Sequence, residues 1–202
     1  MSEPTRWQLE RSAADSHAYV ERFRELERSG ADLHGEARMI DAAVARGSRI
    51  LDAGCGTGRV ASTLTALGHD VVGVDADGAM IEVARERDDT TRFVHADLAT
   101  LTLTGQAFDV IVLAGNVVPF LADGTLVDVL RRLRAHLTTD GRLVCGWALP
   151  GHQPPGAAAV DADDVDRAAF AADLSLVVRY SSWDRDPWPG DGSWALTVHR
   201  PR

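Results

Sequence analysis

Closely spaced glycines form the strongest chemical signal in the sequence. Residues 50–59 read ILDAGCGTGR, with an apolar run before Gly54 and Gly56 and a helix-like stretch after them. Glycine lets the backbone turn sharply and approach a ligand closely, because no Cβ is in the way. A helix that begins after the loop offers free N–H groups to a carboxylate or phosphate. The segment predicts a ligand-binding strand–loop–helix unit, although a plain turn between two elements would also use glycine.

Two acidic residues follow at places where strands are expected to end. Asp75 ends VVGVD, 21 residues after Gly54, and Asp97 follows FVHA. A carboxylate at the first place can accept hydrogen bonds from both hydroxyls of a ribose, although it can also serve as a helix N-cap. If the first three strands lie side by side, Gly54, Asp75 and Asp97 share one rim, where Asp97 can accept from the amine of an adenine. A nicotinamide cofactor is disfavoured, because Arg59 replaces the third glycine of G-x-G-x-x-G.

The composition excludes several classes of protein. The 202 residues are 45% apolar and 25% charged, which is ordinary for one globular domain. All 21 basic residues are Arg, which removes lysine Schiff-base chemistry, a pyridoxal phosphate anchor and the P-loop lysine. The net charge of −9 argues against a general nucleic-acid binder. Without a signal-peptide core or an apolar run of ~18 residues, we expect a cytoplasmic protein with no membrane partner. Cys55 and Cys145 fit neither a metal site nor a disulfide framework.

Strand and helix patterns alternate along the chain. Helices are predicted at 15–28, where Asp15 or Ser16 would be the N-cap, and at 35–46. The expected strands are 49–53, 70–75, 91–95, 108–114 and 143–149, with helices at 60–66, 79–87 and 124–136 between them. A helix at 161–172 and strands at 174–183 and 194–200 follow. This order predicts an α/β fold, Rossmann-like and doubly wound, with a mostly parallel seven-stranded sheet and an antiparallel C-terminal hairpin. We expect one domain over 1–202: a helical cap (1–47), a cofactor-binding core (48–150), and a C-terminal helix and hairpin (151–202).

Several segments resemble, in order, the motifs of class I S-adenosylmethionine-dependent methyltransferases. They are LDAGCGTGR, VVGVDAD, HADL, FDVIVLAGNVVPFL and DGRLVCG, and the resemblance covers about residues 49–149. It implies S-adenosylmethionine as cofactor and S-adenosylhomocysteine as product. It also implies these contacts: Asp52, Gly54, Cys55 and Gly56 around the methionine part, Asp75 at the ribose, Ala76 and Met80 beside the adenine, Asp97 and Leu98 at its edge, and Ala114 and Gly115 beside the sulfonium.

The same resemblance implies that the N-terminal helices fold over the cofactor. Tyr19, His34 and Arg38 are then candidate contacts, and Arg38 would pair either with the cofactor carboxylate or with a surface acid. Transfer of the methyl group is an in-line displacement, so no covalent nucleophile is needed and the catalytic residue stays unassigned. His34 and His152 are the histidines that we consider as bases. No metal site is expected.

The methyl acceptor should bind where the loops after the strands meet. These loops are 115–123, 150–160 and 184–193, and the last is expected to bring Trp183, Asp184, Arg185 and Trp188 near the pocket mouth. The NVVPF segment (116–120) lacks the paired prolines of the Asn-Pro-Pro-aromatic loop of amide and exocyclic-nitrogen methyltransferases, so that chemistry is not carried over. We expect a small-molecule acceptor. The alternatives are a methyltransferase acting on protein or RNA, and a non-catalytic cofactor-binding module. The oligomeric state is not predicted.

Overall fold

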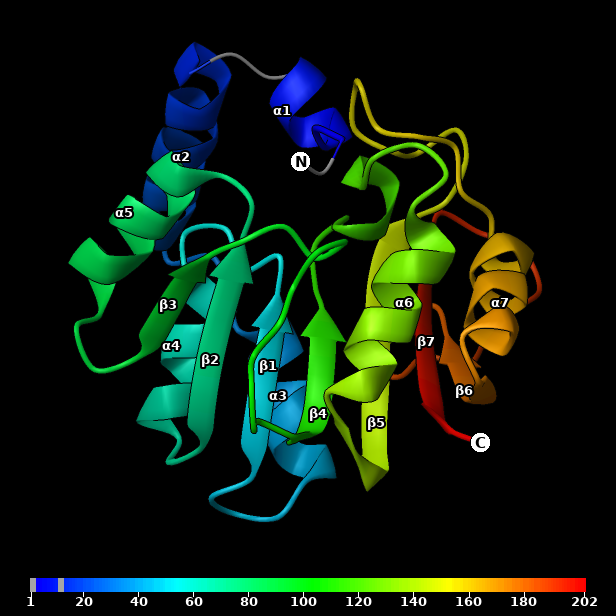
Figure 1. Cartoon of the computed structure of the whole chain (residues 1–202). Coiled ribbons are helices and arrows are strands. Elements are labelled where there is room, and N and C mark those ends of the chain that lie inside the picture. Colours follow the sequence, from blue (N-terminus) through cyan, green and yellow to red (C-terminus); the bar gives the residue numbers. More distant parts are fainter. Residues whose placement is uncertain (1–2, 11–12) are drawn as a thin grey trace.

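Seven strands form one mixed sheet in the computed structural model, which describes residues 3–10 and 13–202. The strand order is β3-β2-β1-β4-β5-β7-β6 (Figure 1). Neighbouring strands from β3 to β5 are parallel, and β7 is antiparallel to both β5 and β6. The predicted fold is therefore confirmed. The strands are β1 (Arg49–Ala53), β2 (Asp70–Asp75), β3 (Arg92–His95), β4 (Phe108–Leu113), β5 (Leu137–Ala148), β6 (Leu174–Tyr180) and β7 (Trp194–Pro201).

Helices cover both faces of this sheet. One face packs against α3 (Gly35–Ala43), α4 (Arg59–Ala66) and α5 (Gly78–Arg87), and the other against α6 (Leu126–Ala135) and α7 (Ala162–Ala171). The alternation of side chains along β4 shows why. Val110 and Val112 belong to the buried cluster that includes residues of α3, α4 and α5. Ile111 and Leu113 belong to the buried cluster that includes residues of α6 and α7. From Val110 to Leu113 the strand is apolar at every position and buried on both faces, as parallel strands are.

Two helices at the N-terminus lie beyond the carboxyl ends of the central strands (Figure 1). The short α1 (Arg6–Glu10) was not predicted, because five residues are too few to show helical periodicity. The longer α2 (Ala13–Arg28) begins before the predicted start at residue 15. Of the N-terminal helices, α3 differs from α1 and α2 because its buried residues pack on the face of the sheet.

The strand order determines which residues meet at the rim. Because β3, β2 and β1 are neighbours, Gly54, Asp75 and Asp97 come to the same edge of the sheet. On the side of the sheet opposite β3, β6 runs in the same direction as β5, but β7 lies between them. The end of β6 is therefore separated from β4 by two strands.

The ring of Phe93 fixes the glycine loop against β2. A Cβ on Gly73 would lie 2.6 Å from Phe93 Cδ1, and a Cβ on Gly58 would lie 2.7 Å from Phe93 Cζ. The ring thus fills the space between the sheet and the start of α4, and glycine is needed at both positions for it to fit.

We predict that Gly73→Ala destabilises the fold by about 1–3 kcal/mol, because the added methyl group forces the Phe93 ring out of its place. Gly35→Ala is the control, since a Cβ there meets its nearest atom at 3.8 Å and alanine favours the helix. Urea unfolding of both variants measures the difference. Equal stability of Gly73→Ala and wild type would contradict the role of Phe93.

Candidate functional site

A cavity of about 600 Å³ opens at the carboxyl ends of the central strands. A side pocket of about 50 Å³ shares Gly54, Gly56 and Gly115 with it. Every predicted cofactor-binding residue except Arg38 lines one of the two. The cavity is lined by Gly54, Gly56, Asp75, Ala76, Met80, Asp97, Leu98 and Gly115, and the side pocket adds Asp52, Cys55 and Ala114.

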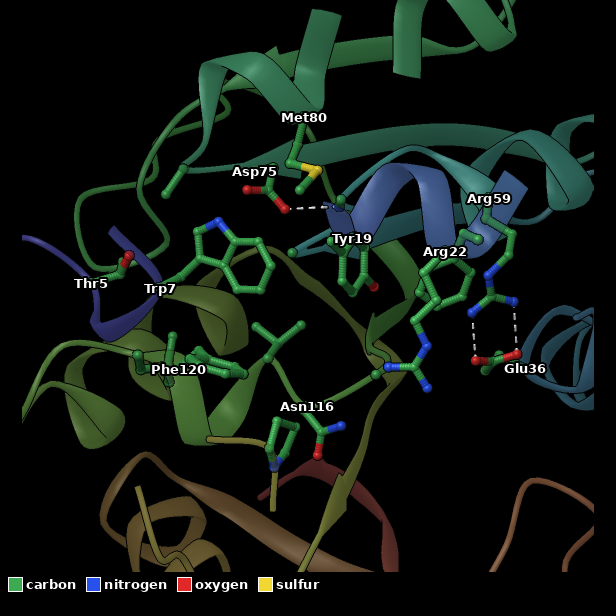
Figure 2. Close-up of a pocket in the computed structure, with 18 of the residues that line it drawn as sticks. Thr5, Trp7, Tyr19, Arg22, Glu36, Arg59, Asp75, Met80, Asn116 and Phe120 are labelled. Atoms are coloured by element: carbon green, nitrogen blue, oxygen red, sulfur yellow. Dashed lines mark hydrogen bonds and ion pairs between the residues drawn. The ribbon is translucent and has the colours of Figure 1, made fainter. Parts of the chain in front are cut away.

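Backbone hydrogen bonds to Asp75 and to the end of β2 hold the glycine loop. The N–H groups of Gly54 and Cys55 donate to the Val74 carbonyl, at 2.7 and 2.9 Å. The Gly56 N–H donates to Asp75 Oδ2 at 2.8 Å (Figure 2), and the Asp77 N–H donates to Oδ1 at 2.9 Å. Burial raises the pKa of Asp75 despite these two donors. Each carboxylate oxygen keeps further acceptor capacity, which a pair of ribose hydroxyls would use.

The loop leaves open space where side chains would otherwise stand. Gly56 has a φ of +52°, and a Cβ built on it meets no atom within 4 Å. Gly54 has a φ of +84°, and its Cβ would lie 2.4 Å from Val117 Cγ2. Gly54 therefore permits close packing of the loop after β4, whereas Gly56 keeps the floor of the cavity free for a ligand.

Asp52 has a buried oxygen atom that no group of the described structure satisfies. Its Oδ2 accepts the Ala61 N–H at 3.0 Å, whereas its Oδ1 has no partner. Burial raises the pKa of Asp52 from 3.8 to about 7, against the lowering effects of Arg59 and the Ala61 N–H. A cationic ammonium group in the side pocket would satisfy this oxygen and favour the ionised form. The residues present thus fit the amino group of a methionine moiety.

The arginines near the cavity differ in whether they are paired. Arg59 is held by Glu36, at 2.6 and 2.9 Å (Figure 2), and contacts the Leu33 carbonyl. Arg38 does not line the cavity and instead pairs with Asp32 at 2.7 Å, which lowers the pKa of Asp32 to about 2. Of the two alternatives for Arg38, the structure shows the surface ion pair.

Arg22 on α2 differs from Arg38 in its position. It lines the cavity, and Figure 2 shows its guanidinium directed into the open space between Tyr19 and Asn116. No ion pair of Arg22 occurs among the described residues. The sequence analysis did not single out Arg22, because the sequence does not show which of the exposed helical arginines faces the cavity.

Aromatic side chains line the part of the cavity below α1. Trp7 packs edge-on against Tyr19 and Phe120, each with ring centroids 5.4 Å apart. Its Nε1 donates to Asp77 Oδ2 at 2.9 Å, and Arg6 forms a two-point contact with Asp123 at 2.7 and 3.0 Å. These contacts hold α1 over the cavity, so that a ligand beneath it is shielded from water. Burial also raises the pKa of Tyr19, so its hydroxyl stays a hydrogen-bond donor.

Two of the three loops expected on the acceptor side contribute to the cavity. The loop after β4 supplies Asn116, Val117, Phe120 and Leu121, and the loop after β5 supplies Pro154. The third expectation is wrong: no residue from Trp183 to Trp188 lines the cavity, because β5 and β7 separate β6 from β4. Trp183 packs over Gly146 instead.

The histidines considered as bases also lie outside the cavity lining. His34 is exposed and its Nδ1 lies 3.1 Å from Thr63 Oγ1, and His152 is exposed on the loop after β5. Within residues 3–10 and 13–202, no group of three His, Cys, Asp or Glu side chains is arranged to hold a metal ion. Cys55 and Cys145 are free and buried. None of the helices in the described part of the chain has the length and apolar character needed to cross a membrane.

Comparisons with known proteins agree with this geometry. Residues 50–141 match a family described as "Methyltransferase domain". A TehB-like S-adenosylmethionine-dependent methyltransferase from Corynebacterium glutamicum is 36% identical in sequence to this chain. Its crystal structure superposes on this one with a TM-score of 0.87. That match covers 95% of this chain and 100% of the other.

Curated relatives are similar over a shorter stretch. A demethylmenaquinone methyltransferase of Clavibacter sepedonicus is 35% identical over 108 residues, which are 52% of this chain and 43% of the relative. A ubiquinone biosynthesis O-methyltransferase of Roseobacter denitrificans is 39% identical over 104 residues, 50% of this chain and 41% of the relative. The chain thus matches less than half the length of these relatives.

The raised pKa of Asp52 predicts a pH-dependent stability. A carboxyl group that is protonated more readily in the folded than in the unfolded chain contributes most below about pH 4, and this contribution is lost as the pH rises to about 7. We predict that Asp52→Asn, which copies the protonated form, becomes more stable relative to wild type by about 2–3 kcal/mol between pH 5 and pH 8, at about 1.4 kcal/mol per pKa unit. Denaturant unfolding of the ligand-free proteins measures this, and an unchanged difference would show that Asp52 is ionised throughout.

Proposed function

The chain belongs to the class I S-adenosylmethionine-dependent methyltransferases, and from this we propose that it methylates a small molecule bound in the cavity described above. S-adenosylhomocysteine is the product left by the cofactor. The observation that carries the proposal is that one cavity joins the glycine loop and the two acids to an apolar space below α1. Such a cavity lies within the size range of sites that bind small ligands.

The strand order suggests how the cofactor lies along the rim. We assign its adenosine part to the ends of β2 and β3, where Asp75 would accept from the ribose and Asp97 from the adenine amine. Ala76, Met80 and Leu98 would contact the base. The methionine part then extends over β1 toward β4, with Asp52 at the amino group and Ala114 and Gly115 near the sulfur. Ligands of doubly wound sheets bind beyond the carboxyl ends of the strands, which supports these roles.

We assign the cofactor carboxylate to Arg22. A free carboxylate in a partly enclosed cavity needs a cation, and Arg22 is the cavity-lining arginine without an ion pair among the described residues. The Tyr19 hydroxyl, one helical turn away, is a second donor. This assignment replaces Arg38, which is engaged by Asp32.

When bound, S-adenosylmethionine supplies a methyl group that is already activated on a cationic sulfur. The chain then has to position the acceptor in line behind that carbon and to exclude water, which is where most of the rate enhancement of such a transfer arises. The walls formed by Trp7 and Phe120 serve the second purpose. No side chain is assigned as a general base.

The charge and the relatives favour a small acceptor. The net charge of −9 disfavours RNA, and α1 covers the cavity to which a protein segment would need access. The relatives include a demethylmenaquinone methyltransferase and a ubiquinone biosynthesis O-methyltransferase, and also a malonyl-[acyl-carrier protein] O-methyltransferase, whose acceptor is carrier-bound. The small-molecule acceptor, the cytoplasmic location and the absence of a nucleic-acid partner stay predictions.

The assignment of Arg22 is tested with a matched pair of variants. We predict that Arg22→Gln weakens binding of both S-adenosylmethionine and S-adenosylhomocysteine by about tenfold or more, because a charged hydrogen bond to the carboxylate is lost. Arg38→Gln, a change of the same size in a neighbouring helix, should bind both as wild type does. Isothermal titration calorimetry measures the affinities of wild type and both variants for the two ligands. If Arg22→Gln binds S-adenosylhomocysteine as tightly as wild type, Arg22 does not hold the carboxylate.

A further inference from the structure

The Asn116 side chain is held in one orientation by the backbone of β5. Its Oδ1 accepts the Ala148 N–H at 2.7 Å, and the backbone N–H of Asn116 donates to the Gly146 carbonyl at 3.3 Å. A backbone N–H can donate only to the amide oxygen, so the hydrogen bond itself identifies which end of the amide is oxygen. The NH₂ group must then point the other way. Figure 2 shows the nitrogen on the side of the open cavity and the oxygen directed away from it.

This NH₂ group has no hydrogen-bond partner within the described structure. Asn116 lines the cavity and is partly buried, so its two donors face the space that a ligand would fill. A donor held at a fixed position and left without a protein partner is a feature expected of a ligand-binding group.

The backbone requirement at this position does not explain the choice of asparagine. Asn116 has a φ of +72°, a left-handed conformation that asparagine and aspartate both tolerate. An aspartate oxygen would also accept the Ala148 N–H. What asparagine adds is the NH₂ group that faces the cavity.

Most of the surrounding wall is apolar. The cavity is lined there by Trp7, Val117, Phe120, Leu121 and Pro154, and the Arg22 guanidinium lies on the side toward α2 (Figure 2). The indole N–H of Trp7 is already given to Asp77. The carboxylates at the rim, Asp75 and Asp97, stand at the ends of β2 and β3, on the far side of β1 from Asn116.

We propose that the part of the cavity over β4 and β5 binds a planar, largely apolar methyl acceptor that carries a carbonyl or carboxylate oxygen, and that the Asn116 amide donates a hydrogen bond to this oxygen. Asn116 is thus a specificity-determining residue, which orients the acceptor toward the cofactor. The inference rests on the proposed function, because it takes the remaining part of the cavity to hold S-adenosylmethionine. The flat faces of Trp7 and Phe120 supply contact area for an aromatic body, and Asn116 supplies a fixed neutral donor that sets its direction.

Two probes that differ in one carbonyl oxygen test the proposal. They are 4-hydroxyacetophenone and 4-ethylphenol, and each is titrated into the protein saturated with S-adenosylhomocysteine, with binding followed by ligand-observed NMR. A merely apolar pocket prefers 4-ethylphenol, which has less hydration to lose. We expect wild type to prefer 4-hydroxyacetophenone by about fivefold, the size of a net neutral hydrogen bond.

The matched variant is Asn116→Asp, which keeps the bond to the Ala148 N–H and the left-handed backbone but removes the NH₂ group. We expect it to lose the preference for the carbonyl probe when both probes are titrated at a saturating concentration of S-adenosylhomocysteine. Should Asn116→Asp fail to fold, Asn116→Gly retains the backbone conformation and also lacks the donor.

The outcomes separate this inference from the proposed function. Failure of wild type to bind S-adenosylhomocysteine would overturn the proposed function itself. If that ligand binds but neither probe does, or wild type prefers 4-ethylphenol, the proposed class of acceptor is wrong. An equal carbonyl preference in wild type and Asn116→Asp would show that Asn116 is not the donor.

Discussion

The buried carboxylate of Asp75 is the interaction on which the rest of the site depends. It accepts the N–H groups of Gly56 and Asp77, and so ties the glycine loop after β1 to the end of β2. The Asp77 side chain continues the connection, because its Oδ1 caps α5 and its Oδ2 accepts from Trp7 and Ser16 in the two N-terminal helices. The Asp75 carboxylate thus fixes the glycine loop at the floor of the cavity, and the Asp77 side chain binds the helices α1 and α2 above it. Two backbone donors only partly compensate a buried charge, and a ribose would supply the remaining hydrogen bonds.

The cavity has two halves because of the order of the strands. Acidic side chains stand over β2 and β3, while the apolar walls and Asn116 stand over β4 and β5. The glycine loop after β1 lies between them. A cofactor bound across this loop would have its adenosine part in the polar half and its reactive methyl group at the apolar half. An acceptor there would be shielded from water by Trp7 and Phe120. The protein would then orient the two reactants and exclude water, which is sufficient for a methyl group that is already activated.

Much of the fold could be predicted from the sequence, because buried parallel strands are continuous apolar runs. Strands β1 and β2 begin and end where predicted, and the order of the first three strands placed Gly54, Asp75 and Asp97 together. Helix α1 was missed, since five residues carry no period. Arg38 was considered from the sequence and Arg22 was not, because both are exposed arginines on helices, and only the packing of α2 shows that Arg22 faces the cavity. The tryptophans after β6 were placed at the pocket mouth because the width of two intervening strands was not considered. The orientation of the Asn116 amide depends on a bond to β5, which is distant in sequence.

The central claim is that S-adenosylmethionine lies over the glycine loop, and calorimetric titration of Gly56→Ala tests it most directly. Gly47→Ala is the matched control, because Gly47 also has a positive φ (+71°), also has no atom within 4 Å of a built Cβ, and does not line the cavity. Both variants should lose about 1–2 kcal/mol of stability from the left-handed backbone. Only Gly56→Ala should lose affinity for S-adenosylmethionine and S-adenosylhomocysteine, by on the order of tenfold or more, because its methyl group occupies ligand space. Equal, wild-type affinity in both variants would contradict the account and place the cofactor elsewhere.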